Sequence, residues 1–384
     1  GDAIHPDRLG TIFSGSAVVD SQNTAGFQTG DESPIVCIYT SAGETSAWSK
    51  GQPFTQSLAY SNDRGRTWTK FSGNPVLKHI VGGNRDPKVV WHEPTRRWIM
   101  ALYLDKNDFA LFASPNLKKW THLQTIAMPD CAECPDFFPM PVEGDKNRVK
   151  WVLTAANGRY FVGDFDGRKY TPSSGPHDAN WGGWYYAVQS YSDIPPADGR
   201  RIQLAWMAGG DYPGMPFNQQ MNFPGEMTLR ALPEGLRICR SPAREIESLR
   251  VKTHTLGEAS LKPGENPLAA IKAELLDIEA EIEPGLAAQF GFEIRGQRLV
   301  YSAKDRTLAF LDKSAKVEPI DGRVRLRILI DRTTVEVYAN DGRVPMSICW
   351  LPKPDDRGLG LFAAGGSAKI VSLRVHELKS AWQH

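Results

Sequence analysis

An internal repeat of about 50 residues constrains the fold of this chain more than any other feature of its sequence. Two landmarks recur with this spacing and in the same phase. The first is a polar turn that ends in an aromatic residue, found at Trp68, Trp120 and Tyr170. The second is a polar turn followed by an apolar strand, and the strands begin at residues 97–100, 150–153 and 202–205. Such repeats, rich in turns and short strands, are typical of the four-stranded blades of a β-propeller.

The repeat predicts about four blades in this chain. They cover residues 12–72, 86–123, 134–171 and 185–240. Each blade begins with an apolar run that we expect to be its innermost strand, next to the central channel. The residues that begin these runs are therefore expected to meet in one cavity, and they are Ser14, Asp86, Glu133 and Trp184.

The pattern changes after residue 240. Residues 241–252 predict a linker with a short helix, and alternating strands such as 323–330 and 334–338 follow. Asn340-Asp341-Gly342 is a strong hairpin turn. We therefore predict an all-β chain, with a propeller domain over residues 1–240 and a β-sandwich domain over residues 253–384.

Charge and cysteine usage exclude several classes of function. Lys and Arg number 45 and Asp and Glu number 44, so no basic face favours nucleic acid or an anionic membrane. Cys131 and Cys134 form a lone C-x-x-C, without the second pair that a zinc site of this kind uses. The eight His residues include no H-E-x-x-H motif. We expect no metal, no cofactor, no nucleic acid and no membrane partner.

Two acidic residues occupy equivalent positions in successive repeats. Asp86 lies in Arg85-Asp86-Pro87, and Glu133 lies 47 residues later in Glu133-Cys134-Pro135-Asp136. A repeat that brings two carboxyl groups to one centre provides what glycoside hydrolysis requires. We therefore expect a carbohydrate-active site at the channel.

Four motifs make the chain resemble glycoside hydrolase family 32, the group of invertases, levanases and inulinases. They are Phe13-Ser14-Gly15-Ser16, Arg85-Asp86-Pro87, Glu133-Cys134-Pro135-Asp136 and the segment 331–337. The resemblance extends from about His5 to Trp382. It implies a five-bladed propeller followed by a β-sandwich, and activity on β-fructofuranosidic bonds in sucrose, inulin or levan by a retaining mechanism.

The resemblance implies a role for each acidic residue. Glu133 corresponds to the general acid/base, and a crowded, water-poor pocket would raise its pKa and keep it protonated. Asp86 corresponds to the transition-state stabiliser that holds two hydroxyl groups of the fructosyl ring. The positive charge of Arg85 is expected to favour the ionised form of Asp86.

The resemblance also predicts the residues around the sugar. Phe13 and Ser14 would line the subsite, while core packing is a comparable explanation for Phe13. Trp184 stands where the family usually carries an Asp, so this part of the subsite departs from the family pattern. The predicted substrate-binding residues are Arg85, Phe13, Ser14, Cys134, Gln56, Trp184 and Tyr185.

The nucleophile of the family is an Asp in a Trp-x-Asn-Asp-Pro-Asn-Gly type motif, and this motif is not found in the sequence. Roughly one blade is therefore expected to be missing. Two hypotheses stay open: a β-fructofuranosidase whose first blade lies elsewhere, and an inactive or weak fructan-binding relative. The box at residues 61–68 also resembles a sialidase repeat, but it occurs once. We further expect a secreted or periplasmic protein, with the cytoplasm as an alternative, and self-association through an open propeller edge.

Overall fold

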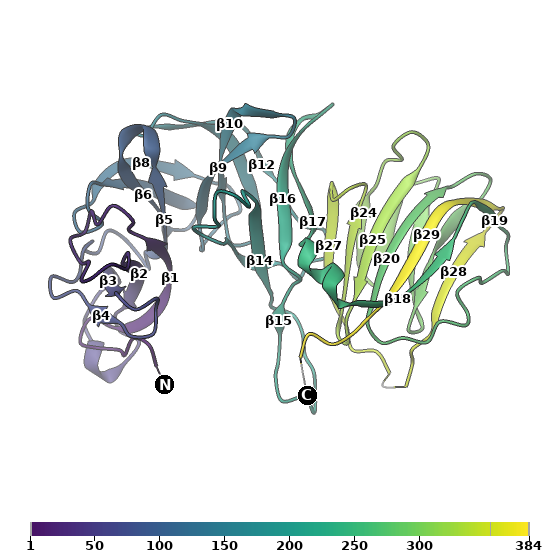
Figure 1. Cartoon of the computed structure of the whole chain (residues 1–384), viewed down its shortest axis with the longest axis horizontal. Coiled ribbons are helices and arrows are strands. Elements are labelled where there is room, and N and C mark those ends of the chain that lie inside the picture. Colours follow the sequence, from purple (N-terminus) through teal and green to yellow (C-terminus); the bar gives the residue numbers. More distant parts are fainter. Residues whose placement is uncertain (1, 354, 383–384) are drawn as a thin grey trace. The chain divides into compact units, whose positions relative to one another are not determined.

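A computed structural model describes residues 2–353 and 355–382, and its regular secondary structure is almost entirely strand (Figure 1). The described residues fall into two compact units. The first comprises the residues through Asp178, together with Ala187–Arg201 and Ala231–Leu236. The second comprises Ala179–Tyr186, Ile202–Arg230 and the residues from Arg237 onward. No helix in the described part of the chain has the length and apolar character to cross a membrane.

The first unit contains three successive groups of four antiparallel strands, each in chain order (Figure 1). The first group is β1 (Thr11–Val19), β2 (Ile35–Ala42), β3 (Thr55–Ser61) and β4 (Thr69–Lys70). The second is β5 (Arg85–His92), β6 (Arg97–Asp105), β7 (Asp108–Ser114) and β8 (Thr121–Ala127). The third is β9 (Asp136–Val142), β10 (Asp145–Thr154), β11 (Tyr160–Phe165) and β12 (Tyr170–His177). This up-and-down order is that of propeller blades, and the groups coincide with the predicted repeat.

Strand β6 shows why these groups stack against one another. Successive side chains of a strand point to opposite faces, and β6 is apolar on both. Met100 belongs to a buried core that includes Ile38 of the first group. Ile99 belongs instead to the core that includes Phe137 and Trp151 of the third group. A strand that is apolar on both faces must lie between two neighbours.

Short elements complete the first unit. They are the 3-10 helices η1 (Ala47–Ser49) and η2 (Glu93–Thr95), and strand β13 (Tyr186–Ser190), whose first residue belongs to the second unit. The chain that follows provides β14 (Arg201–Met207), β15 (Gln220–Met221), β16 (Gly225–Leu232) and β17 (Gly235–Pro242). The predicted linker helix is a 3-10 helix, η3 (Arg244–Leu249). It begins two residues after the end of β17 at Pro242.

The sandwich is formed by two antiparallel sheets. In strand order, the larger sheet is β18 (Arg250–Leu256), β29 (Ala368–Leu378), β20 (Leu276–Glu283), β25 (Val324–Ile330), β26 (Thr334–Ala339) and β27 (Val344–Cys349), and β19 (Ala259–Leu261) pairs with β29. The smaller sheet is β24 (Lys313–Lys316), β23 (Thr307–Phe310), β22 (Gln297–Ser302), β21 (Gln289–Ile294) and β28 (Leu359–Ala364).

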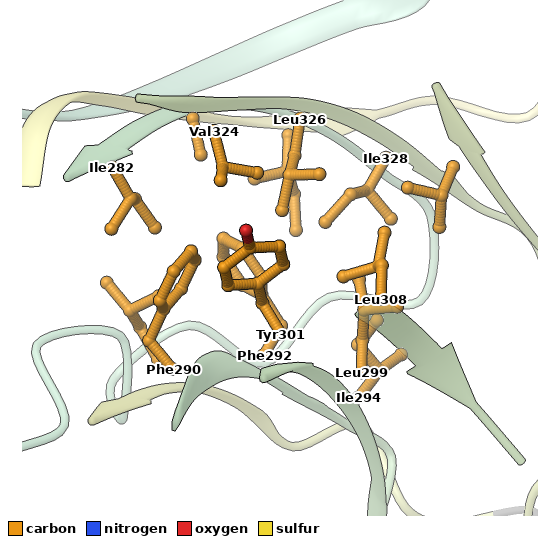
Figure 2. Close-up of a cluster of buried hydrophobic side chains, with 14 of the residues drawn as sticks. Ile282, Phe290, Phe292, Ile294, Leu299, Tyr301, Leu308, Val324, Leu326 and Ile328 are labelled. Carbon is orange, nitrogen blue, oxygen red and sulfur yellow. The ribbon is translucent and has the colours of Figure 1, made fainter. Parts of the chain in front are cut away.

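The core of the sandwich lies between the inner faces of these sheets. Figure 2 shows Leu326 and Ile328 of the larger sheet facing Phe292 and Leu299 of the smaller one. Strands β26 and β27 are joined by the turn predicted at Asn340-Asp341-Gly342, whose φ angles are 49°, 57° and 78°. That prediction is confirmed.

Candidate active site

Two carboxylate-bearing segments converge where β5 and β9 begin. Asp86 is the second residue of β5 and is 8% exposed, whereas Glu133 lies three residues before β9. The backbone N–H of Cys134 donates to Oδ2 of Asp86 at 3.0 Å, and the Cys134 thiol lies 3.5 Å from the same oxygen. The residue next to Glu133 is therefore bound directly to Asp86, as the repeat predicted.

The backbone at this point is locally strained. Asp86, Glu133 and Cys134 have positive φ angles of 63°, 58° and 43°. Residues other than glycine rarely adopt this left-handed conformation, and each such residue costs about 1–3 kcal/mol. The register of β5 against β6 also shifts between Arg85 and Lys88, which places Asp86 in an irregular part of the strand. Strain and bulges of this kind cluster at functional sites, where they redirect side chains.

Arg85 binds Glu133. Its Nε lies 3.1 Å from Oε1 of Glu133, and a second guanidinium nitrogen contacts the same oxygen. Another nitrogen donates to the carbonyl of Gly83 at 2.6 Å, and the ring of Tyr103 lies 4.8 Å from the guanidinium carbon. Burial lowers the pKa of Arg85, but the hydrogen bond with Glu133 and the nearby negative charges outweigh this effect and the pKa is raised.

Arg85 favours the ionised form of Asp86, as expected, but burial has the larger effect. Burial raises the pKa of Asp86, and the Cys134 N–H and the charge of Arg85 only partly oppose this rise. Arg85 does act in the predicted direction, but its Nε lies 3.9 Å from Asp86 because its guanidinium is bound to Glu133. Loss of hydration is therefore the larger effect on this carboxyl group.

Cys134 supports the site without chemistry of its own. Burial raises the pKa of its thiol, and the nearby Asp86 charge raises it further. The group therefore stays a neutral thiol, which is a poor nucleophile and a poor metal ligand. Across residues 2–353 and 355–382, no three His, Cys, Asp or Glu side chains group as metal ligands would.

Phe13 and Ser14 lie in a register shift of β1, between Ile12 and Gly15. Phe13 is 41% exposed, and its ring contacts Phe54 edge-on with 5.7 Å between centroids. Two residues further along, the hydroxyl of Ser16 bonds both the carbonyl of Pro87 and the N–H of Val89 at 3.0 Å, which joins β1 to β5. The start of β1 is thereby held beside the strand that carries Asp86.

The other three predicted sugar-binding residues are Gln56, Trp184 and Tyr185. Gln56 is fully buried, and it reaches Asp86 only through Thr40. Trp184 and Tyr185 belong to the second unit. Tyr185 is buried and its hydroxyl donates to Gln203, and the ring of Trp184 lies 5.8 Å from the ammonium group of Lys313. Their assignment to the sugar site stays a prediction.

Sequence reasoning missed the polar residues behind the site. Thr40 accepts the N–H of Asp86, Gln189 donates to the carbonyl of Cys134, and the ring of Tyr103 stacks on Arg85. The carbonyl of Asn84 accepts the amide of Gln56. The available signal was the run of polar residues in two adjacent strands, Thr40 and Ser41 in β2 and Thr55, Gln56 and Ser57 in β3. Buried polar side chains require partners, so such positions indicate an internal hydrogen-bond network.

Comparisons with known proteins identify the family of the chain. The family model described as "Glycosyl hydrolases family 32 N-terminal domain" matches residues 2–242. The model described as "Glycosyl hydrolases family 32 C terminal" matches residues 245–377. A levanase from Bacillus subtilis (strain 168) is 38% identical over 99% of this chain and 62% of its own length. An extracellular exo-inulinase from Aspergillus ficuum is 27% identical, covering 96% of this chain and 81% of its own.

A solved structure gives the same result for the fold. The β-fructofuranosidase from Schwanniomyces occidentalis, complexed with fructosyl-erythritol, matches with a TM-score of 0.83 and 25% identity, over 96% of this chain and 83% of the other. The predicted fold class, an all-β propeller followed by a β-sandwich, is confirmed. The chain spans less than two thirds of the length of the Bacillus subtilis levanase.

Proposed function

The chain belongs to glycosyl hydrolase family 32, and from that premise we propose that it hydrolyses β-fructofuranosidic bonds in sucrose, inulin or levan. The convergence of Asp86 and Glu133 carries this proposal. A hydrogen bond of 3.0 Å between Asp86 and the residue after Glu133 holds two carboxyl groups at one end of the innermost strands. Their surroundings differ, because Asp86 is buried and Glu133 is ion-paired with Arg85.

In the proposed reaction, Glu133 protonates the glycosidic oxygen of the leaving group and later accepts a proton from water. Its side chain is 29% exposed, so a substrate oxygen can reach it. Asp86 accepts hydrogen bonds from two hydroxyl groups of the fructosyl ring. These bonds strengthen as the ring gains positive charge, which lowers the barrier.

A retaining reaction also needs a carboxylate nucleophile about 5–5.5 Å from the acid/base. The sequence contains no Trp-x-Asn-Asp-Pro-Asn-Gly motif, so we assign this role to none of its residues. This observation favours a second candidate function. In that case the chain binds a fructosyl ring at Asp86, with Arg85 and Phe13 beside it, and does not cleave the bond.

The proposal includes a location and a state of assembly. A secreted protein fits a polymeric substrate, and one relative is described as extracellular. Self-association through a propeller edge is the assembly we propose. Light scattering at several protein concentrations tests it, and a constant mass equal to one chain would contradict it.

The first experiment measures fructose released from sucrose, inulin and levan by the purified chain, with Glu133→Gln as the matched control. Fructose release by the wild type, but not by Glu133→Gln, supports the hydrolase function. If neither protein releases fructose, calorimetry with fructose and inulin follows. Binding that Asp86→Ala abolishes supports the binding protein, and the absence of both release and binding contradicts both candidates.

A further inference from the structure

A buried polar pair lies behind Asp86. Thr40 of β2 and Gln56 of β3 are directly opposite each other in the hairpin, and both are fully buried. The Thr40 hydroxyl donates to Oε1 of Gln56 at 2.7 Å, and Nε2 of Gln56 donates to the carbonyl of Asn84 at 3.1 Å. The pair therefore reaches from the first blade to the residues that precede β5.

The orientation of each group in this pair follows from hydrogen-bond chemistry. The carbonyl of Asn84 can only accept, so the amide nitrogen of Gln56 must face it and the amide oxygen must face Thr40. The Thr40 hydroxyl must then donate its single proton to Gln56. Its remaining lone pairs are left for another donor, and the backbone N–H of Asp86 occupies that position at 3.0 Å.

The same bonds continue across the site. Oδ2 of Asp86 accepts the N–H of Cys134, and the carbonyl of Cys134 accepts Nε2 of Gln189 in β13 at 3.1 Å. A connected series of hydrogen-bonded residues therefore runs from β3 through Thr40, Asp86 and Cys134 to β13. It passes through two residues, Asp86 and Cys134, whose φ angles are positive.

We propose that Thr40 and Gln56 are positioning residues that hold Asp86 in its left-handed conformation and direct its carboxylate toward Cys134 and the bound sugar. An unfavourable backbone conformation persists only when its surroundings impose it. The register of β5 shifts at Asp86, so the backbone N–H of Asp86 is outside the regular pairing with β6. The hydroxyl oxygen of Thr40 accepts this N–H instead. A small displacement of a reacting group costs about 100-fold in rate, so such a tether has a catalytic consequence.

Thr40→Val tests this inference, with Thr40→Ser as the matched control. Valine keeps the shape of threonine and removes the hydroxyl, whereas serine keeps the hydroxyl. The primary readout is the titration of Asp86 by NMR in protein labelled with ¹³C at the Asp carboxyl groups, with Asp86→Asn to assign the signal. The charged or titratable groups around Asp86 are unchanged in both variants, and they are Arg85, Glu133, Cys134 and Tyr103.

In Thr40→Val we expect Asp86 to lose its bond from Cys134, and its pKa to rise by about one pH unit, because that bond favours the charged form. Thr40→Ser should titrate like the wild type. Gln56→Met removes the acceptor that orients the Thr40 hydroxyl, so it should also raise the pKa of Asp86. This variant replaces Thr40→Val as the test if Thr40→Val does not fold. Identical titration curves in all the folded variants would overturn the inference.

A kinetic readout rests on the proposed function. If the wild type releases fructose, Thr40→Val should lower kcat about 10- to 100-fold with a smaller change in KM, and Thr40→Ser should restore it. A loss of thermal stability with unchanged kcat would mean that the pair is only structural. A wild type that releases no fructose contradicts the hydrolase, while the titration still tests the positioning role.

Discussion

The two acidic residues of the candidate site have the same formal charge and different surroundings. Asp86 is buried and receives an N–H and a thiol, while Glu133 is partly exposed and is bound by Arg85. Burial favours the neutral form of Asp86, and the ion pair with Arg85 is made by Glu133. The proposed roles therefore rest on the family motifs in which the two residues lie and not on these contacts.

Tyr103 supports the guanidinium group that holds Glu133. Its ring lies 4.8 Å from the Arg85 carbon, an arrangement that contributes about 0.5–2 kcal/mol. Tyr103→Leu should therefore lower the apparent affinity for fructose or inulin several-fold, because Arg85 and Glu133 lose their fixed orientation. Tyr103→Phe keeps the ring and is the control. Calorimetry measures the difference, and equal affinities for the two variants would contradict the prediction.

The raised pKa of Asp86 predicts how stability depends on pH. The native state holds this proton more tightly than the unfolded chain does, so stability falls as pH rises from the usual value of 3.8 through the raised value. Asp86→Asn removes the buried charge. It should be more stable than the wild type at pH 7, by about 1.4 kcal/mol for each unit of pKa shift.

Urea unfolding at pH 7 and at pH 3.5 checks this prediction. The stability difference between Asp86→Asn and the wild type should be largest at pH 7 and much smaller at the acidic value, where Asp86 is mostly protonated in both states. A variant that is less stable than the wild type at pH 7 would contradict it. In the same variant, fructose release should fall because an amide carries no charge to stabilise the ring.

At the scale of single elements, the innermost strands combine regular pairing with one irregular point each. Strand β1 shifts register between Ile12 and Gly15, and β5 shifts between Arg85 and Lys88. Beyond these points both strands pair regularly with the next strand of their blade. The irregular points carry Ser14 and Asp86, so local departures from the ladder position the candidate site.

Gly15 provides a test of this packing. A Cβ atom at this position would lie 2.0 Å from the carbonyl oxygen of Ile38 in β2. Gly15→Ala should therefore destabilise the protein by about 1–3 kcal/mol, because β1 must move away from β2. Gly257→Ala, where a Cβ would meet nothing within 4 Å, is the control. Thermal unfolding measures both, and equal melting temperatures would contradict the prediction.

At the scale of the whole molecule, residues on both sides of the predicted linker belong to one compact unit. Glu336 of the sandwich is fully buried and accepts the N–H of Phe223 at 2.6 Å. Its other oxygen accepts the hydroxyls of Tyr338 and Ser347 at 3.0 Å. Burial raises the pKa of Glu336, and the charge of Arg240 partly opposes this rise. The domain boundary predicted at residues 241–252 stays a proposal.

Replacing Glu336 should destabilise this unit. Glu336→Ala leaves the Phe223 N–H and two hydroxyls without their acceptor and Arg240 without a nearby opposite charge, and such losses cost about 3–5 kcal/mol. Glu336→Gln keeps one acceptor and should cost less. Chemical denaturation monitored by tryptophan fluorescence distinguishes them. Similar midpoints for the wild type and Glu336→Ala would contradict the prediction.

The part of the candidate site that follows the repeat could be predicted from the sequence. Asp86 lies at the start of β5 and Glu133 just before β9, so the repeat alone predicted that the two residues would lie near each other. The hydrogen bonds of Gln56 could not be predicted, because they depend on how β3 packs beside β2 and the residues before β5. The ion pair between Arg85 and Glu133 could not be predicted from the sequence either. Arg85 is adjacent to Asp86 in the chain, but adjacent residues need not have side chains in contact.

The sequence by itself determined the all-β class, the blades and the position of the motifs, because hydrophobic periodicity and turn residues act over short stretches of chain. Only the tertiary structure decided the left-handed backbone of Asp86, its raised pKa and its tether to Thr40. These features depend on hydrogen bonds and burial between residues far apart in the chain. A local sequence pattern cannot predict such contacts, because they form only when the blades pack against one another.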